Sequence, residues 1–266
     1  MDKEKKNSEY WANRVANETW NKYNSYEEQN KNLLEFYKEA ILDIEEELYR
    51  LMIKIGEKPT LTDMHDNNRL TKLKKKMEGI VKELTEKTIE HNKDQLIEAI
   101  KEQYKDVSIA IGKEDFSLPK KKEMEMMLNN PWSGMNYSER VWENNRVLAS
   151  NLNEILTRGL IQGKSVMDMT KELNDRMMKG FNRSHTLIRT EVMHYMNESS
   201  LKSYKDANVK EVEIYAAEDE RTCEHCGSEH TKVYKIDKAP ILPFHPRCRC
   251  TYLPVIKFET NKKEVV

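Results

Sequence analysis

The chain of 266 residues has no cysteine before Cys223, and all four of its cysteines fall between Cys223 and Cys250. It also has no apolar run close to the about 20 residues that a membrane helix needs, and we expect no membrane contact. The opening segment, Met1–Lys6, lacks the apolar core of a secretion signal, so we expect the chain to be made in a cytoplasm. In a reducing compartment, clustered cysteines indicate a metal site rather than disulfides.

The chain also lacks a strong net charge. Its 45 Lys+Arg and 46 Asp+Glu residues leave a formal net charge of −1. No overall field therefore draws it to nucleic acid, and any contact with DNA must come from local patches such as the lysine runs at 72–76 and 120–122. Such runs are more often solvated faces. The hydrophobic fraction of 38% and the charged fraction of 34% suit long solvated helices better than a thick globular core.

The strongest periodic signal lies between residues 34 and 55, where apolar residues recur three and four apart, as in the seam of a coiled-coil-like helix. Gly56 and Pro59 follow, and they predict the end of this helix. A second seam spans Leu70–Leu84. We therefore predict an elongated antiparallel helical hairpin in which each narrow apolar stripe covers the other. The first seam consists of Leu34, Tyr37, Ile41, Ile44, Leu48, Leu51 and Ile55.

Other segments predict further helices and a change of period. Residues 10–20 predict a helix that docks by its aromatic side chains. After a composition change at 129–134, residues 142–160, a segment capped by Ser165, and residues 184–204 predict three more helices. Beyond Asn208 the alternation at 212–215, 233–236 and 250–253 predicts short strands. Four of the seven prolines lie between Pro240 and Pro254, as expected for a small loop-rich β unit with little core of its own.

These patterns predict a mainly α protein with a small C-terminal α+β unit. The predicted domains are an N-terminal helical region at residues 1–128 and a second domain at 129–256. The second domain ends in a zinc-stapled β unit at about 209–256, and residues 257–266 form a tail.

The cysteine cluster carries the clearest chemistry. Cys223 and Cys226 form a C-x2-C turn, which places two thiolates on one side of a tight loop as half of a tetrahedral zinc site. The segment from His245 to Cys250 supplies the other half. A structural zinc ion would tie these two segments together.

The pattern leaves open which four atoms bind the ion. Cys248 and Cys250 share one face of an extended strand, so four cysteines are the preferred set. His245 is the alternative for the fourth position, while His225 and His230 are expected to be solvated loop residues. A catalytic zinc would keep an open coordination position, and a site closed by four thiolates has none.

Glu191 and His194 share one face of the helix that leads into the β unit. Half of a di-iron site has this spacing, but no matching second pair stands out. The preferred interpretation is that Arg189 and Glu191 form ion pairs that fix the helix against the zinc unit.

The order of these motifs resembles the phage Mu F-like minor head proteins over roughly residues 130–256. The resemblance lies in five segments: Trp132–Gly134, Tyr137–Trp142, Ile188–Glu191, Asp219–Cys226 and His245–Cys250. The residues that it carries over are Arg189, Glu191, Asp219, Cys223, Cys226, His245, Cys248 and Cys250.

This resemblance implies a minor capsid protein of a tailed bacteriophage, present in several copies inside the virion near the portal and made in the host cytoplasm. It implies the portal protein and the capsid interior as partners, help in head assembly, and roles in DNA packaging or ejection through local Lys/Arg patches. It implies no enzymatic activity. Two alternatives stay open: a zinc-dependent hydrolase, nuclease or toxin-type enzyme using Glu191, His194 and His245, and a zinc-ribbon nucleic-acid-binding module. The second alternative needs a basic face on the β unit, for which Arg221, Lys232, Lys235, Lys238, Arg247 and Arg249 are available.

Overall fold

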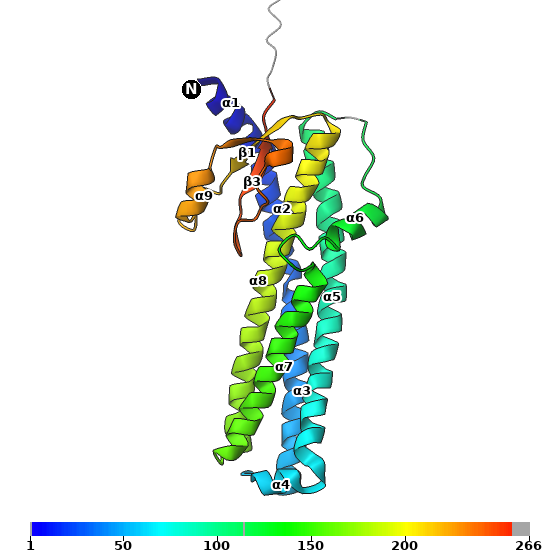
Figure 1. Ribbon diagram of the computed structural model, residues 1–266, viewed down its shortest axis with the longest axis vertical. Coiled ribbons are helices and arrows are strands. Elements are labelled where there is room, and N and C mark those ends of the chain that lie inside the picture. The colour runs from blue at the N-terminus through cyan, green and yellow to red at the C-terminus, as the bar shows by residue number, and fades with distance from the viewer. Residues whose placement is uncertain (1, 114, 257–266) are drawn as a thin grey trace, which may run out of the picture. The chain divides into compact units, whose positions relative to one another are not determined.

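The computed structural model describes residues 2–113 and 115–256, with side chains from Asn7 onward (Figure 1). The predicted C-terminal tail, 257–266, lies outside the described residues. Helices account for most of the described chain, and a small antiparallel sheet follows them, so the predicted fold class is confirmed.

Compact packing divides the chain into two units, and each unit is built from separated segments. Unit 1 takes in the residues up to Ser25, Leu96–Met127 and the residues from Arg189 onward, and unit 2 takes in Tyr26–Gln95 and Leu128–Ile188. The predicted domains, 1–128 and 129–256, are continuous ranges of sequence. The packing units do not test these boundaries, so the domains stay a prediction.

Unit 2 is a bundle of four helical segments, which run side by side in Figure 1. They come from α3 (Lys31–Ile55), α5 (Arg69–Ala110), α7 (Tyr137–Ile161) and α8 (Val166–Asp206). The short α4 (Leu61–His65) and a single 3₁₀ turn, η2 (Asp66–Asn68), connect the first two. A capping box at Thr60 and Asp63 begins α4.

The predicted hairpin is formed by α3 and α5. Ion pairs join Glu47 to Lys76 and Glu39 to Lys87, so residue numbers fall on one helix as they rise on the other, and the two helices are antiparallel. Gly56 ends α3 with φ +90°, a backbone conformation that favours glycine.

The apolar stripes of the hairpin pack against α7 and α8 as well as against each other, so the prediction was incomplete. A fully buried hydrogen-bonded layer joins all four helices of unit 2. The Tyr37 hydroxyl donates to Asn145 Oδ1 at 3.2 Å and lies 2.7 Å from Ser184 Oγ, while Asn145 Nδ2 donates to Thr85 Oγ1 at 2.8 Å. These residues lie on α3, α7, α8 and α5. Burial raises the pKa of Tyr37 to about 12, so its hydroxyl stays protonated and can donate.

Two helices predicted from Ser165 and from 184–204 are one helix, α8, of 41 residues. Ser165 caps its start, as predicted, since its hydroxyl accepts the Asp168 N–H at 3.1 Å. Likewise, α5 extends over 42 residues, well beyond the predicted seam at Leu70–Leu84. Both α5 and α8 contribute residues to each unit.

Unit 1 contains the sheet, with strand order β2-β1-β3 and both pairings antiparallel. The strands are β1 (Glu211–Tyr215), β2 (Val233–Lys235) and β3 (Thr251–Pro254), close to the three predicted segments. The helix α9 (Glu224–Glu229) lies between β1 and β2, and a 3₁₀ turn, η3 (Ile236–Lys238), follows β2. The helix α6 (Lys121–Leu128) begins in unit 1.

The N-terminal helices pack on this sheet. They are α1 (Asp2–Trp11), a π-helical turn η1 (Ala12–Ala16) and α2 (Asn17–Gln29). As predicted, aromatic side chains dock them: Trp11 is buried, and Trp20 Nε1 donates to the Arg249 carbonyl at 2.9 Å. The core of unit 1 therefore joins residues from both ends of the described chain, which the predicted linear domains did not anticipate.

The buried layer of unit 2 gives the first prediction. Tyr37→Phe removes the hydroxyl and leaves buried polar groups of Ser184 and Asn145 without that partner, so the free energy of unfolding should fall by about 1–3 kcal/mol. Chemical denaturation followed by circular dichroism measures the change. The matched control is Tyr49→Phe on the same helix, because Tyr49 is 58% exposed and its loss of a hydroxyl should be nearly neutral. Equal effects in the two variants would contradict the role of the layer.

Candidate metal centre

The first half of the site is the turn that begins α9. Cys223 occupies the N-cap position in an extended conformation, and its Sγ accepts the N–H of Cys226 at 3.4 Å. This turn brings the two sulfurs to the same side of the helix start, as the C-x2-C spacing predicted. Cys226 is buried in the core of unit 1, whereas Cys223 is exposed.

The second half is the loop from His245 to Cys250. His245 Nε2 lies 3.3 Å from Cys223 Sγ and 3.2 Å from Cys226 Sγ, and the sulfurs of Cys226 and Cys248 are 3.6 Å apart. Edges of about 3.5–3.8 Å are expected between donors around one tetrahedral zinc ion, given Zn–S and Zn–N bonds of about 2.3 and 2.1 Å. These three separations therefore lie at or slightly below the spacing that zinc requires.

The five predicted donors form two overlapping groups. Cys223, Cys226 and His245 have ligand atoms within 4.8 Å of one another, and so do Cys226, Cys248 and Cys250. The structure thus brings together every predicted metal residue, with Cys226 in both groups. This cluster can hold a metal ion, while the identity of the ion and of its four ligands stays a prediction.

The orientation of His245 suits a metal ligand. Its Nδ1 lies 2.9 Å from the Pro246 carbonyl, and because a carbonyl only accepts, Nδ1 carries the proton. The lone pair of Nε2 then points at the two sulfurs of the α9 turn. Such an outer hydrogen bond commonly fixes the tautomer of a metal-bound histidine.

Hydrogen bonds lower the pKa of two of the four thiols. A hydrogen bond with the Cys250 side chain, together with the Cys250 N–H at 3.5 Å, lowers the pKa of the Cys248 thiol to about 5. The N–H of Cys226 lowers the pKa of Cys223 in the same way. Burial, and then the charge of Cys248, raises the pKa of Cys226 to about 12. Several thiolates this close repel one another, and a bound cation would offset that repulsion.

One face of α8 holds the cysteine loop in place. The N–H of Arg247 donates to Thr190 Oγ1 at 3.2 Å, His194 Nδ1 donates to the Leu242 carbonyl at 2.8 Å, and Asn197 Nδ2 donates to the Cys250 carbonyl at 2.9 Å. Two turns further along α8, the Tyr204 hydroxyl donates to the Tyr252 carbonyl at 3.0 Å. We call Thr190, His194, Asn197 and Tyr204 the α8 polar stripe; at about 100° per residue they lie within about 80° of one another.

An ion pair lies beside the loop. Arg249 Nη2 contacts Asp219 Oδ1, and this hydrogen bond holds the pKa of the Asp219 carboxyl well below its usual range. Arg221 binds the same carboxylate through its backbone N–H and its guanidinium. Asp219, carried over from the resemblance, therefore links the segment before α9 to the cysteine loop.

Glu191, His194 and Arg189 lie where they could not easily reach a substrate. Glu191 is completely buried, and His194 Nδ1 is hydrogen-bonded to the Leu242 carbonyl of the loop. Arg189 Nε donates to the Tyr23 hydroxyl at 2.9 Å, with its guanidinium over the Tyr23 ring. The predicted ion pairs of Arg189 and of Glu191, which would fix the helix against the zinc unit, stay a prediction.

His225 and His230 lie outside the donor groups. His225 is exposed and packs edge-on against the Phe244 ring, while His230 is half-buried and its Nδ1 accepts the Ala216 N–H at 3.1 Å.

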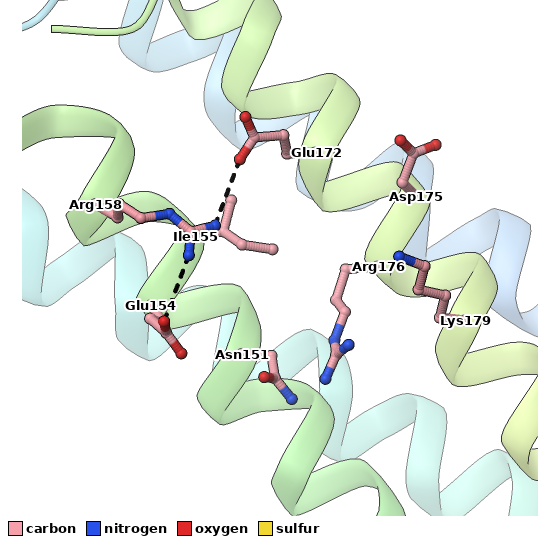
Figure 2. A pocket seen from close by; sticks show the side chains of 8 residues that line it. All are labelled: Asn151, Glu154, Ile155, Arg158, Glu172, Asp175, Arg176 and Lys179. Atoms are coloured by element: carbon pink, nitrogen blue, oxygen red, sulfur yellow. Dashed lines mark hydrogen bonds and ion pairs between the residues drawn. The ribbon is translucent and has the colours of Figure 1, made fainter. Parts of the chain in front are cut away.

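A separate pocket in unit 2 has a different character. Figure 2 shows Arg158 between Glu154 and Glu172, with which it forms ion pairs at 3.5 and 3.7 Å. The pocket is lined by Asn151, Glu154, Ile155, Arg158, Glu172, Asp175, Arg176 and Lys179. Three cations balance three carboxylates there, and none of the predicted metal residues lines it.

Comparison with known proteins supports the sequence-based resemblance. Residues 150–253 match the sequence model of the family described as Phage Mu protein F like protein. Over this segment, which is less than half of the chain, the protein is similar to the phage Mu F-like family. The matched segment contains α8 and all five predicted metal residues, and the family is one of phage head proteins. No curated protein and no solved structure gives a significant match to the chain. Among the described residues, no helix is long and apolar enough to cross a membrane.

The α8 polar stripe gives the second prediction. Asn197→Leu keeps the approximate volume of the side chain but removes the donor to the Cys250 carbonyl, which should loosen the loop. Amide hydrogen exchange in residues 245–252 should become faster, and the cost should be about 1–3 kcal/mol.

The matched control for Asn197→Leu is Ser199→Ala. Ser199 is also buried on α8, but its hydroxyl donates to the Ile100 carbonyl at 2.6 Å instead of to the loop. Exchange in the loop should be unchanged in this control. If both variants speed exchange equally, the stripe does not hold the loop specifically.

Proposed function

We propose that this phage Mu F-like chain is a minor head protein of a tailed bacteriophage, bound near the portal inside the virion. The observation that supports the proposal most directly is the family match over the segment that contains both α8 and the cysteine cluster. In this proposal the protein acts by binding. Its helices offer surfaces to the portal and the capsid interior, and the cysteine cluster keeps unit 1 rigid.

We further propose that the cluster binds one structural zinc ion through Cys223, Cys226, His245 and Cys248. Sulfur and imidazole donors are the set that zinc prefers, and three of the separations among these four atoms, two from His245 and one between Cys226 and Cys248, are 3.2–3.6 Å. Cys250 is the remaining thiol, and hydrogen bonding with Cys248 together with burial raises its pKa. When bound, zinc would join the α9 turn to the loop that the α8 polar stripe holds.

A role in assembly, with contact to packaged DNA during packaging or ejection, is part of this proposal. The near-zero net charge limits such contact to local patches, because nonspecific binding to phosphate requires clustered cations.

The nucleic-acid-module alternative is less well supported, because carboxylates neutralise much of the proposed basic face. Arg221 and Arg249 pair with Asp219, and Lys232 pairs with Glu229.

The enzyme alternative also has little support from the geometry. A hydrolytic zinc site needs an open position for water and a general base next to it. The five donors form two overlapping groups of three that share Cys226, and the four-ligand set proposed above would leave no open position for water. His194, which that alternative would use, binds the backbone of the loop, and Glu191 has no exposure to solvent.

The third prediction concerns the metal. Chain purified without added metal should contain about one zinc per molecule by elemental analysis. Cys226→Ser should lose the ion and expose residues after Asn208 to protease, because zinc binding contributes folding free energy. The helical signal of unit 2 should remain. Cys250→Ser is the matched control, since it should keep the ion; loss of zinc in this variant instead would show that Cys250 is a ligand. A folded, metal-free chain with four titratable thiols would contradict the proposal.

The fourth prediction concerns the particle. Mass spectrometry of purified heads from phage that encode this chain should detect it in a few copies, far below the major capsid protein, and it should stay with the portal when heads are disrupted. Glu191→Gln should reduce its incorporation in proportion to lost thermal stability, because a buried polar contact is lost. Absence from heads would reject the structural role. Normal folding and incorporation of Glu191→Gln together with defective phage would indicate catalysis instead.

A further inference from the structure

The helix α3 presents an apolar stripe to solvent, on the side away from its buried residues. Leu42, Tyr49 and Ile53 are 62%, 58% and 68% exposed, whereas Ile44 and Leu48 of the same helix are each 1% exposed. At about 100° per residue, the three exposed residues fall within about 40° of one another. We call them the α3 stripe. Single exposed apolar residues are ordinary, but three aligned over three turns form a surface that can pack against another helix.

The neighbouring helices of unit 2 flank this stripe without covering it. On one side Glu47 pairs with Lys76 of α5, and on the other Glu45 accepts a hydrogen bond from Asn174 of α8 at 2.6 Å. The stripe therefore lies on the outside of the unit 2 bundle, between these two lines of contact.

The charges along one flank of the stripe are divided by sign. Glu39, Asp43 and Glu46 lie toward the N-terminal end of α3, and Arg50 and Lys54 lie toward its C-terminal end; all five are exposed. Arg50 already pairs with Glu46 within the helix at 2.6 Å. Asp43 and Lys54 have no ion-pair partner among the residues that the structure describes, so both charges are available to another molecule.

This division matches a second copy of the same helix in the opposite direction. When two identical helices pack antiparallel about a two-fold axis, the same flank of each faces the other with its ends exchanged. The acidic half of one flank then faces the basic half of the other, and the apolar stripe meets itself. A parallel copy would not bring the acidic half of one flank to the basic half of the other.

We propose that two copies of this chain associate through the α3 stripe, with their α3 helices antiparallel. Leu42 of one copy lies opposite Ile53 of the other, and the two Tyr49 rings meet near the two-fold axis. Asp43 and Lys54 form ion pairs between the copies. This contact rests on neither the head function nor the metal.

The strength of this association follows from its size. One pair of helices over a few turns buries less than the about 1,200–2,000 Å² of stable interfaces, so the dimer is weak and depends on concentration. Crowding of several copies at one place would favour it by mass action.

The fifth prediction tests the stripe by sedimentation velocity of the full chain over a wide range of concentrations. The sedimentation coefficient should rise with concentration from monomer to dimer. Ile53→Gln should weaken the dimer by about tenfold or more, because it removes one of the three apolar residues of the stripe from both copies. Ile161→Gln is the matched control, because Ile161 is 66% exposed and lies on α7, away from the stripe. It should associate as the unchanged chain does.

The direction of pairing is tested by charge reversal. The double variant Arg50→Glu/Lys54→Glu makes the flank wholly acidic, and Asp43→Lys/Glu46→Lys makes it mainly basic. Each variant alone should stay monomeric, and an equal mixture of the two should form dimers. The proposal is overturned if the unchanged chain is monomeric at every concentration, if Ile161→Gln weakens the dimer as much as Ile53→Gln, or if mixing restores nothing. Cys226→Ser should dimerise normally, so a failed metal proposal would not be confused with a failed interface.

Discussion

The arrangement of unit 1 depends on the hydrogen bonds that α8 makes to the backbone of the cysteine loop. The segment from Leu242 to Tyr252 has little regular structure before β3, and its peptide groups need partners once they are buried. The α8 polar stripe supplies them at Leu242, Arg247, Cys250 and Tyr252. Because these bonds fix the path of the loop, they also fix where His245 and Cys248 stand relative to the α9 turn. The donor cluster is therefore a consequence of the helix as much as of the cysteine spacing.

Unit 2 uses the same kind of interaction for another purpose. Its buried layer at Tyr37, Thr85, Asn145 and Ser184 takes one polar side chain from each helix. Two helices that meet only through apolar stripes can shift by one turn at little cost. The same shift would leave a buried hydroxyl without its hydrogen-bond partner, which costs free energy. Gly180 adds a steric condition, since a Cβ there would lie 2.8 Å from Leu148. The four helices are thus set in register by a few specific contacts, while the apolar seams supply most of the burial.

Three kinds of sequence pattern predicted features that the structure contains. The apolar period located α3 and the early part of α5, the alternation located the three strands, and the cysteine spacing predicted a cluster that includes His245. The α8 polar stripe was missed because Thr190, His194 and Asn197 are polar, and a periodicity search takes polar positions as solvent-facing. The aromatic docking of residues 10–20 was predicted, but Arg249 as the partner of Trp20 was not, since nothing local marks a contact across 229 positions. The sequence predicted two helices in place of α8 because polar turns interrupt the apolar periodicity in the middle of this helix.

The contact between Trp20 and the Arg249 carbonyl has a consequence for the order in which the chain folds during synthesis. A ribosome makes the N-terminal residues first, yet the core of unit 1 needs residues beyond 250 before it can close. All segments of unit 2, by contrast, are present once residue 188 has been made. The four-helix bundle can therefore form while the first helices of the chain still wait, with Trp11 and Trp20 uncovered. Completion of unit 1 is then one of the last events of synthesis, so a truncated chain that ends before the cysteine loop would carry a folded bundle and an exposed aromatic N-terminus.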